Sequence, residues 1–151
     1  MAARASKPCP FCAIARGEAE AEIVLEDETV VAFLDHRPLL AGHCLLVPRR
    51  HVETLPDLPP DLLAPVFHEV QILARAVEWG MAADGSFVAV NTRISQSVPH
   101  LHVHVVPRWK GDGLFSPGRM IWKRSPYRDD GERREAREKI RQAVEEIRRL
   151  R

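Results

Sequence analysis

Apolar and polar positions alternate most regularly between residues 97 and 108. Aliphatic residues there separate three histidines, His100, His102 and His104. Successive side chains of a β-strand point to opposite faces of its sheet, so residues two apart share a face. The pattern predicts a strand whose one face carries the three histidines, while the intervening Leu and Val side chains pack against a core.

Other stretches of the chain carry further strand and helix patterns. Short apolar runs bounded by turn residues predict strands over residues 23–25, 29–34, 43–48 and 86–91. Apolar residues at spacings of three and four predict a helix that is capped by Asp61 and ends at Gly80. A charged amphipathic pattern predicts a second helix from Asp130 onward, whereas residues 13–22 favour at most a short helix broken near Gly17.

The order of these elements decides the fold class. Five strands joined mostly by short loops, with helices before and after them, indicate an α+β protein built on an antiparallel sheet. A chain of 151 residues is long enough to bury a core, and we expect a single domain over residues 1–151. Residues 109–127 are rich in Gly, Pro and aromatic residues, show no period, and are interpreted as a lid or an interface segment.

Composition and charge narrow the function classes. The formal net charge of +1 gives no electrostatic reason to expect a nucleic acid or an anionic membrane as partner. No apolar run approaches the roughly 18 residues of a membrane-spanning helix, and the N-terminus lacks the apolar core of a signal peptide. We therefore expect a cytoplasmic protein without a nucleic-acid or membrane partner.

The histidine row is the strongest chemical signal. Neighbouring histidines on a strand lie about 6.6 Å apart and the outer two about 13 Å, so an undistorted strand cannot bring all three to one metal ion. Imidazoles near neutral pH serve as nucleophiles, proton donors or metal ligands. A merely polar outer face is the alternative, which we disfavour because three of the chain's 7 histidines stand in strict alternation.

Two cysteines three positions apart, Cys9 and Cys12, are the second signal. In a reducing compartment such a pair indicates a metal site or a redox motif rather than a structural disulfide. A thioredoxin-type motif follows a strand, and no strand is predicted before residue 9. We favour zinc, which requires two more ligands, over a redox pair or unremarkable thiols.

The residues from His100 to Val106 resemble the motif of the histidine triad (HIT) superfamily of nucleotidyl hydrolases and transferases. Residues 35–51 resemble the superfamily's second block, with Asp, Pro, His, Pro and His at its spacing. Together with the cysteine pair, the resemblance covers about residues 9–110 and leaves residues 111–151 as a C-terminal extension. It implies a five-stranded sheet with a long helix and a C-terminal helix, and a homodimer formed across a two-fold axis.

The resemblance implies roles for four histidines. His102 is the nucleophile that attacks an α-phosphorus, and the carbonyl oxygen of His100 holds its second N–H. His104 contacts phosphate oxygens or the leaving group, and His43 on a neighbouring strand completes the set. The catalytic residues that it predicts are His43, His100, His102 and His104.

The resemblance also assigns substrate contacts. Asp35 matches the acid that binds the ribose hydroxyls, and Phe33 on the same strand is a candidate wall of the base pocket, although plain core packing also explains it. Three residues before the histidines resemble phosphate contacts: Asn91, Gln96 and Ser97. As an alternative, each of the three satisfies its own backbone in a turn. The loop before Gln96 is shorter than the family's, and Ser95 stands where glycine is expected.

For the cysteine pair, the resemblance favours a structural zinc ion. Zinc takes four nitrogen or sulfur ligands in a tetrahedron. Galactose-1-phosphate uridylyltransferases and zinc-binding histidine triad proteins use a cysteine pair, a histidine after the second block and the first triad histidine. The matching residues are Cys9, Cys12, His51 and His100.

Several functions remain open from the sequence. Pro107 and Arg108, followed by Gly111 and Asp112, resemble the fragile-histidine-triad branch, which cleaves dinucleoside polyphosphates, and we favour that activity. One alternative is a nucleoside phosphoramidate hydrolase, and another is a nucleotide-binding regulator with little turnover. A last alternative is hydrolysis by zinc-bound water, which predicts that a chelator abolishes activity.

Overall fold

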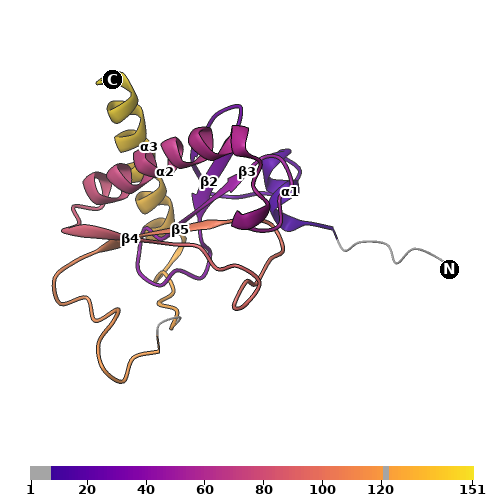
Figure 1. Cartoon of the computed structure of the whole chain (residues 1–151). Coiled ribbons are helices and arrows are strands. Elements are labelled where there is room, and N and C mark those ends of the chain that lie inside the picture. Colours follow the sequence, from indigo (N-terminus) through magenta and orange to yellow (C-terminus); the bar gives the residue numbers. More distant parts are fainter. Residues whose placement is uncertain (1–7, 121–122) are drawn as a thin grey trace.

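A computed structural model describes residues 8–120 and 123–151. Its centre is a five-stranded antiparallel sheet in the order β1-β2-β3-β5-β4, which confirms the predicted α+β class (Figure 1). The strands are β1 (Ile23–Glu26), β2 (Val30–Leu34), β3 (Cys44–Pro48), β4 (Gly85–Ala89) and β5 (Val103–Arg108). The helices are α1 (Pro10–Ala15), α2 (Pro60–Gly80) and α3 (Asp130–Arg149), with a 3-10 turn at Leu55–Asp57.

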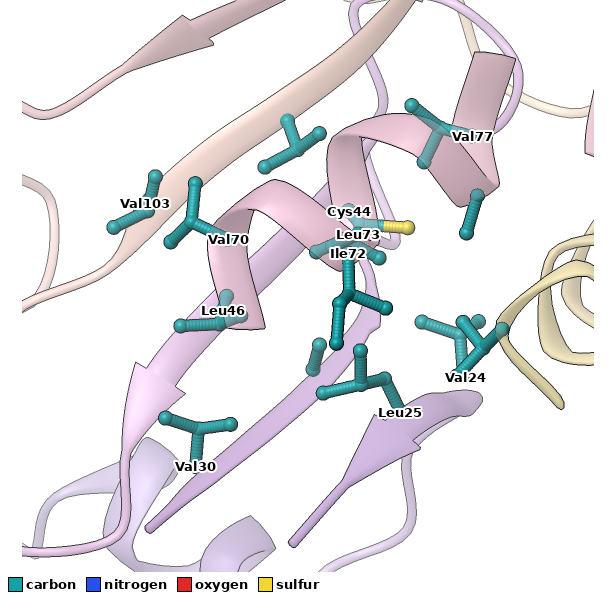
Figure 2. Close-up of a cluster of buried hydrophobic side chains, with 14 of the residues drawn as sticks. Val24, Leu25, Val30, Cys44, Leu46, Val70, Ile72, Leu73, Val77 and Val103 are labelled. Atoms are coloured by element: carbon teal, nitrogen blue, oxygen red, sulfur yellow. The ribbon is translucent and has the colours of Figure 1, made fainter. Parts of the chain in front are cut away.

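Both long helices belong to one side of the sheet. α2 packs against β4 and β5, and α3 packs against α2 and β1 (Figure 1). Figure 2 shows the core between α2 and the sheet. Leu73 and Val77 of α2 belong to the same buried cluster as strand residues such as Val30 and Leu46. These four side chains are wholly buried, and each contributes about 1.5–3 kcal/mol of hydrophobic stabilisation. In the part of the chain that the structure describes, no helix combines the length and apolarity needed to cross a bilayer.

The opposite face of the sheet carries the candidate chemistry. In β2, Val30, Ala32 and Leu34 belong to the helix-side core, whereas Phe33 belongs to a second cluster on the other face. Leu45 of β3 shares that second cluster and pairs with His104 of β5. The short helix α1 covers part of this face because Phe11 packs into the same cluster.

The histidine strand is shorter than predicted. β5 begins at Val103, so His100 and His102 precede the ladder rather than lying within it. The neighbouring strand β3 ends at Pro48, whose carbonyl accepts from the His100 ring at 2.8 Å, and the Leu101 N–H donates to the carbonyl of Val52 at 2.7 Å. The predicted division of faces nevertheless holds, because the aliphatic residues of the row are buried in the helix-side core.

Two helix starts were also predicted wrongly. α1 begins at Pro10 and includes Cys12, because the Cys9 sulfur caps it by accepting the Cys12 N–H at 3.4 Å. α2 is capped by Pro59 rather than Asp61, since Pro60, with its fixed φ and missing N–H, suits the first helical position.

The described residues between β5 and α3 pack onto the loop that follows β2. Leu114 is wholly buried against Leu39, and the Ser125 N–H donates to the Pro38 carbonyl at 2.7 Å. The Gly42 N–H donates to the hydroxyl of Tyr127 at 2.9 Å. We name residues 112–120 and 123–127 the strap. Its interpretation as a lid or an interface stays a prediction.

Candidate functional site

Four histidines gather on the open face of the sheet. His43 and His100 are wholly buried, and His102 and His104 are nearly so. The His102 and His104 rings lie 5.0 Å apart between centroids, and His43 lies 5.2 Å from His104. The structure thus brings together all four histidines that the resemblance assigned to catalysis, while their roles stay predictions.

His102 is held in one tautomer. Its Nδ1–H donates to the carbonyl oxygen of His100 at 2.8 Å, as the resemblance implied. Because a neutral imidazole carries one proton, Nε2 keeps its lone pair. Burial is the main cause that lowers the pKa of His102, so the ring is neutral at pH 7. A neutral nitrogen of this kind can attack an electrophile without a separate base to deprotonate it.

His43 and His104 form a second oriented pair. The Leu39 N–H donates to His43 Nδ1 at 3.0 Å, so the proton of a neutral His43 is on Nε2. That Nε2–H donates to His104 Nδ1, also at 3.0 Å. His104 therefore carries its proton on Nε2. Burial, followed by the charge effects of His102 and Arg124, lowers the pKa of His104 to about 4.

The same hydrogen bonds argue against a metal ion in this pair. Asp35, His43 and His104 place ligand atoms within 4.8 Å of one another, which is a spacing that a metal ion tolerates. His43, however, uses the Nδ1 lone pair to accept from Leu39, and its remaining nitrogen is protonated. A protonated nitrogen cannot bind a metal, so His43 and His104 form a hydrogen-bond relay instead.

The histidines open into a cavity of about 880 Å³. His102, His104 and Asp35 line it together with apolar side chains that include Phe11 and Phe33. Phe11 lies 5.5 Å from Phe33 between ring centroids. The cavity therefore combines an apolar slot with an acidic and imidazole-lined end.

Asp35 is almost completely buried at the acidic end. One carboxylate oxygen, Oδ1, accepts the Arg37 N–H at 2.9 Å. The other, Oδ2, accepts from Nη1 of Arg124 at 3.0 Å. A carboxylate has about four lone-pair positions, so Asp35 retains room for ribose hydroxyls.

The three predicted phosphate contacts do not share one environment. Ser97 lines the cavity, whereas Asn91 and Gln96 are absent from the cavity lining among the residues that the structure describes. Gln96 instead braces its own loop, since its amide donates to the Glu53 carbonyl at 2.6 Å and accepts the Arg93 N–H at 2.8 Å. For Gln96, the structure favours the turn interpretation over phosphate contact.

Ser95, which stands where the family has glycine, adopts a left-handed backbone with φ of 61°. Arg93 in the same loop has φ of 66°. Non-glycine residues accept this conformation at a cost of about 1–2 kcal/mol. Ser95 therefore keeps the left-handed backbone conformation that a glycine at this position would favour.

A second cluster lies beside the histidine row. The ligand atoms of four residues, Cys9, Cys12, His51 and His100, lie within 4.8 Å of one another. Cys12 Sγ lies 3.2 Å from Nδ1 of His51, and Cys9 Sγ lies 3.3 Å from Nδ1 of His100. Tetrahedral zinc places sulfur and nitrogen ligands about 3.5 Å apart.

The chemistry of His100 also suits a metal ligand. Its Nε2–H donates to the Pro48 carbonyl at 2.8 Å, which leaves the Nδ1 lone pair directed at the two sulfurs. An outer hydrogen bond of this kind commonly orients metal-bound histidines. The donor set therefore fits a zinc ion, and the structure brings together all four predicted ligands.

Sequence reasoning missed three contributors to the site: Phe11, Leu39 and Arg124. Phe11 stands between the two cysteines, so its place beside the histidines follows once the cluster is assembled. Leu39 contributes a backbone N–H, which no side-chain pattern reveals. Arg124 reaches Asp35 across 89 positions of sequence, from a segment without periodicity.

The buried neutral histidines predict acid sensitivity. The pKa values of His43 and His104 in the folded protein lie below the ordinary 6.5. Between about pH 7 and about pH 4 the unfolded chain therefore binds more protons at these two residues than the folded protein does. The free energy of unfolding should therefore fall in this window, by about 3 kcal/mol from His104 alone. Urea unfolding at several pH values measures the slope. His104→Gln should flatten it, the exposed His36→Gln should not, and equal slopes in all three proteins would contradict the assignment.

The chain is similar to several known proteins. A model of the HIT domain family matches residues 16–111. An uncharacterised HIT-like protein of Mycobacterium tuberculosis is 41% identical over 124 residues, which are 81% of this chain and 86% of that protein. A zinc-bound histidine triad family protein from Mycobacterium smegmatis has a similar structure, with a TM-score of 0.80 and 36% identity over 95% of this chain and 97% of that one.

Two other relatives are named as enzymes. A bis(5'-nucleosyl)-tetraphosphatase (asymmetrical) of Schizosaccharomyces pombe is 36% identical over 93 residues, which are 60% of this chain and 50% of that protein. An adenylylsulfatase of Arabidopsis thaliana is 33% identical over 110 residues, which are 72% of this chain and 56% of that protein. The family match and the histidine geometry together confirm the predicted resemblance, and the chain belongs to the HIT domain family.

Proposed function

We propose that the protein is a nucleotidyl hydrolase or transferase that cleaves at the α-phosphate of a nucleotide through a covalent nucleotidyl-His102. The hydrogen bond from His102 Nδ1–H to the His100 carbonyl is the observation that carries the proposal. It leaves an uncharged Nε2 with a lone pair on a ring that lines the cavity. Splitting the transfer into two steps is what covalent catalysis offers.

In the proposed first step, His102 Nε2 attacks the α-phosphorus, and the bond between that phosphorus and the leaving oxygen breaks. The electron pair of this bond departs with the leaving group. The Nε2–H of His104 donates a hydrogen bond to the charge that develops there. In the second step, water attacks the phosphorus and releases one proton to solvent, the P–N bond breaks, and its electron pair returns to Nε2 of His102.

The nucleotide occupies the cavity in a defined order. The base enters the apolar slot beside Phe11 and Phe33, and Asp35 accepts the ribose hydroxyls. Ser97 donates to a phosphate oxygen. This order uses the lining residues from the apolar slot to the histidine end.

The pKa values favour a leaving group that departs as an anion. The pKa of His43 lies well below its ordinary value, mainly through burial, and the pKa of His104 is about 4, so neither ring is protonated at pH 7. A polyphosphate needs no proton in order to leave, whereas an amine does. This supports dinucleoside polyphosphates as substrates over nucleoside phosphoramidates, and two relatives named as a tetraphosphatase and an adenylylsulfatase fit the same chemistry.

His102→Gly is expected to lower kcat on a diadenosine polyphosphate by about 10⁴-fold or more, because it removes the nucleophile. AMP binding, followed by calorimetry, should persist because Asp35 and the apolar slot remain. His68→Gln, on an exposed position of α2, serves as the control and should keep wild-type turnover. Unchanged hydrolysis in His102→Gly would remove His102 from the mechanism. Persistent binding with no hydrolysis in the wild type would instead favour a regulator.

Substrate class is decided by comparing turnover of a diadenosine polyphosphate and of an AMP-lysine conjugate. We expect a higher kcat/KM for the polyphosphate, because its leaving group needs no proton. Activity on the conjugate alone would assign the protein as a phosphoramidate hydrolase.

We also propose a structural zinc ion held by Cys9, Cys12, His51 and His100. The distances within the cluster support it, as does the similarity to a protein described as zinc-bound. When bound, zinc would tie α1 to the residues just before β5 and supply no nucleophile. Its ligands have to be deprotonated thiols and neutral imidazoles.

Protein purified without chelator should carry one zinc ion per chain by metal analysis, and Cys12→Ser should lose it. Cys44→Ala is the matched control and should keep it, because Cys44 lies outside the cluster and donates to the Gly42 carbonyl at 3.3 Å. Mild chelation should lower Tm while hydrolysis continues. Loss of hydrolysis with Tm unchanged would point to zinc-bound water instead.

We further infer a cytoplasmic homodimer joined along β4. This strand is an edge of the sheet and pairs only with β5 among the described strands. Val88 on it is 43% exposed, and the ring of Phe115, half exposed, packs on Phe87 of the same strand. An apolar edge strand of this kind is a template for pairing with another chain.

Light scattering during size-exclusion chromatography should give twice the chain mass for the wild type. Val88→Lys should shift the mass toward the monomer, because it places a charge on the edge. Leu63→Lys, at a half-exposed position on α2, should leave the mass unchanged. A wild-type monomer at tens of micromolar would contradict the dimer.

A further inference from the structure

Asp35 lies where two different donors compete for one oxygen. Its Oδ2 accepts from Arg124 Nη1 at 3.0 Å and lies 3.8 Å from Nε2 of His43. The same His43 nitrogen donates to His104 Nδ1 at 3.0 Å. A carboxylate is a stronger acceptor than a neutral imidazole, because a hydrogen bond to a charged acceptor is roughly twice as strong. Movement of about 1 Å would bring Asp35 within bonding distance of His43.

Arg124 reaches this position from the strap. Its Nη1 also donates to the Arg37 carbonyl at 2.8 Å. The next two carbonyls of the same loop accept from the strap as well, since the Ser125 N–H donates to Pro38 at 2.7 Å and Arg119 donates to Leu39 at 3.3 Å. The strap thereby holds the loop whose Leu39 N–H sets the tautomer of His43. The strap lies beyond residues 16–111, which the family model covers.

We propose that Arg124 is a positioning residue that keeps Asp35 from taking the His43 hydrogen bond away from His104. Because the guanidinium donates to Oδ2, Asp35 stays free to bind the nucleotide while the neighbouring hydrogen bond from His43 to His104 is kept. This proposal rests on the proposed function, because it assigns Arg124 to the site that cleaves the nucleotide.

Charge supports the same role. Asp35 is nearly buried, and an unneutralised carboxylate there repels the phosphates of a nucleotide. Arg124 offsets that charge at 3.0 Å. After burial and the charge of a neighbouring histidine, its positive charge also lowers the pKa of His43 and of His104, in keeping with its place beside Asp35.

A double-mutant cycle separates this role from a structural one. Where Asp35 is intact, Arg124→Gln should lower kcat about tenfold, because Asp35 is then released to bind His43. In an Asp35→Asn background, the same substitution should change kcat by less than about twofold, because the competing charge is gone. Arg124→Lys, which keeps the charge, should recover part of kcat in the wild-type background.

Arg119→Gln is the matched control from the same strap. Arg119 bonds to Leu39 and Lys123 carbonyls, and no hydrogen bond joins it to Asp35 among the described residues. Its substitution should lower kcat by the same factor in both Asp35 backgrounds. Arg128→Gln, an exposed position paired with Glu132, should have no effect in either.

Nitrogen-15 NMR of labelled histidines provides a readout without turnover. The wild type should show His104 with an accepting Nδ1 and a protonated Nε2, and Arg124→Gln should move the His104 Nδ1 resonance toward that of an unbonded nitrogen. Asp35→Asn combined with Arg124→Gln should return it toward the wild-type position.

An equal loss of kcat in both Asp35 backgrounds, or an unchanged His104 resonance in Arg124→Gln, would overturn the proposal. If the wild type hydrolyses no AMP-containing compound, the proposed function fails, while the NMR comparison still decides the role of Arg124. If the wild type hydrolyses and Arg124→Gln behaves identically, only the present inference fails.

Discussion

The hydrogen bond between the Nδ1–H of His102 and the carbonyl oxygen of His100 is the constraint on which the site depends. It fixes which nitrogen of His102 faces the cavity without any charged partner. The backbone of His100 is held in turn by its own ring, whose Nε2–H is bound to the Pro48 carbonyl. The end of β3 therefore sets the direction of the proposed nucleophile.

His100 takes part both in the cysteine cluster and in the histidine row. Its ring faces Cys9 and Cys12, and its carbonyl faces His102. A metal ion at the cysteine cluster would stabilise the same backbone that orients the proposed nucleophile. On the other side of the row, the relay of His43 and His104 depends on the loop after β2, which the strap holds. The site is thus supported from the N-terminal helix at one end and from the strap at the other.

The sequence predicted the sheet and the division of faces along the histidine row because both follow from short-range alternation. Residues 100–105 divide between two faces as the period of two requires, and the apolar stripe of α2 marks the helix-side core. It failed where a backbone group or a distant contact decides the structure. The start of β5 depends on backbone groups of Pro48 and Val52. Neither the alternation typical of a strand nor the apolar stripe typical of a helix indicates the pairing of Arg124 with Asp35.

The most direct test of the account is mass analysis of protein quenched during turnover of a diadenosine polyphosphate. The quench has to avoid acid, since a P–N bond to imidazole is acid-labile. We expect one added nucleotidyl group on the peptide that contains His102, and this group should disappear as product forms. Product accumulation without any adduct on that peptide, at times shorter than one turnover, would contradict it.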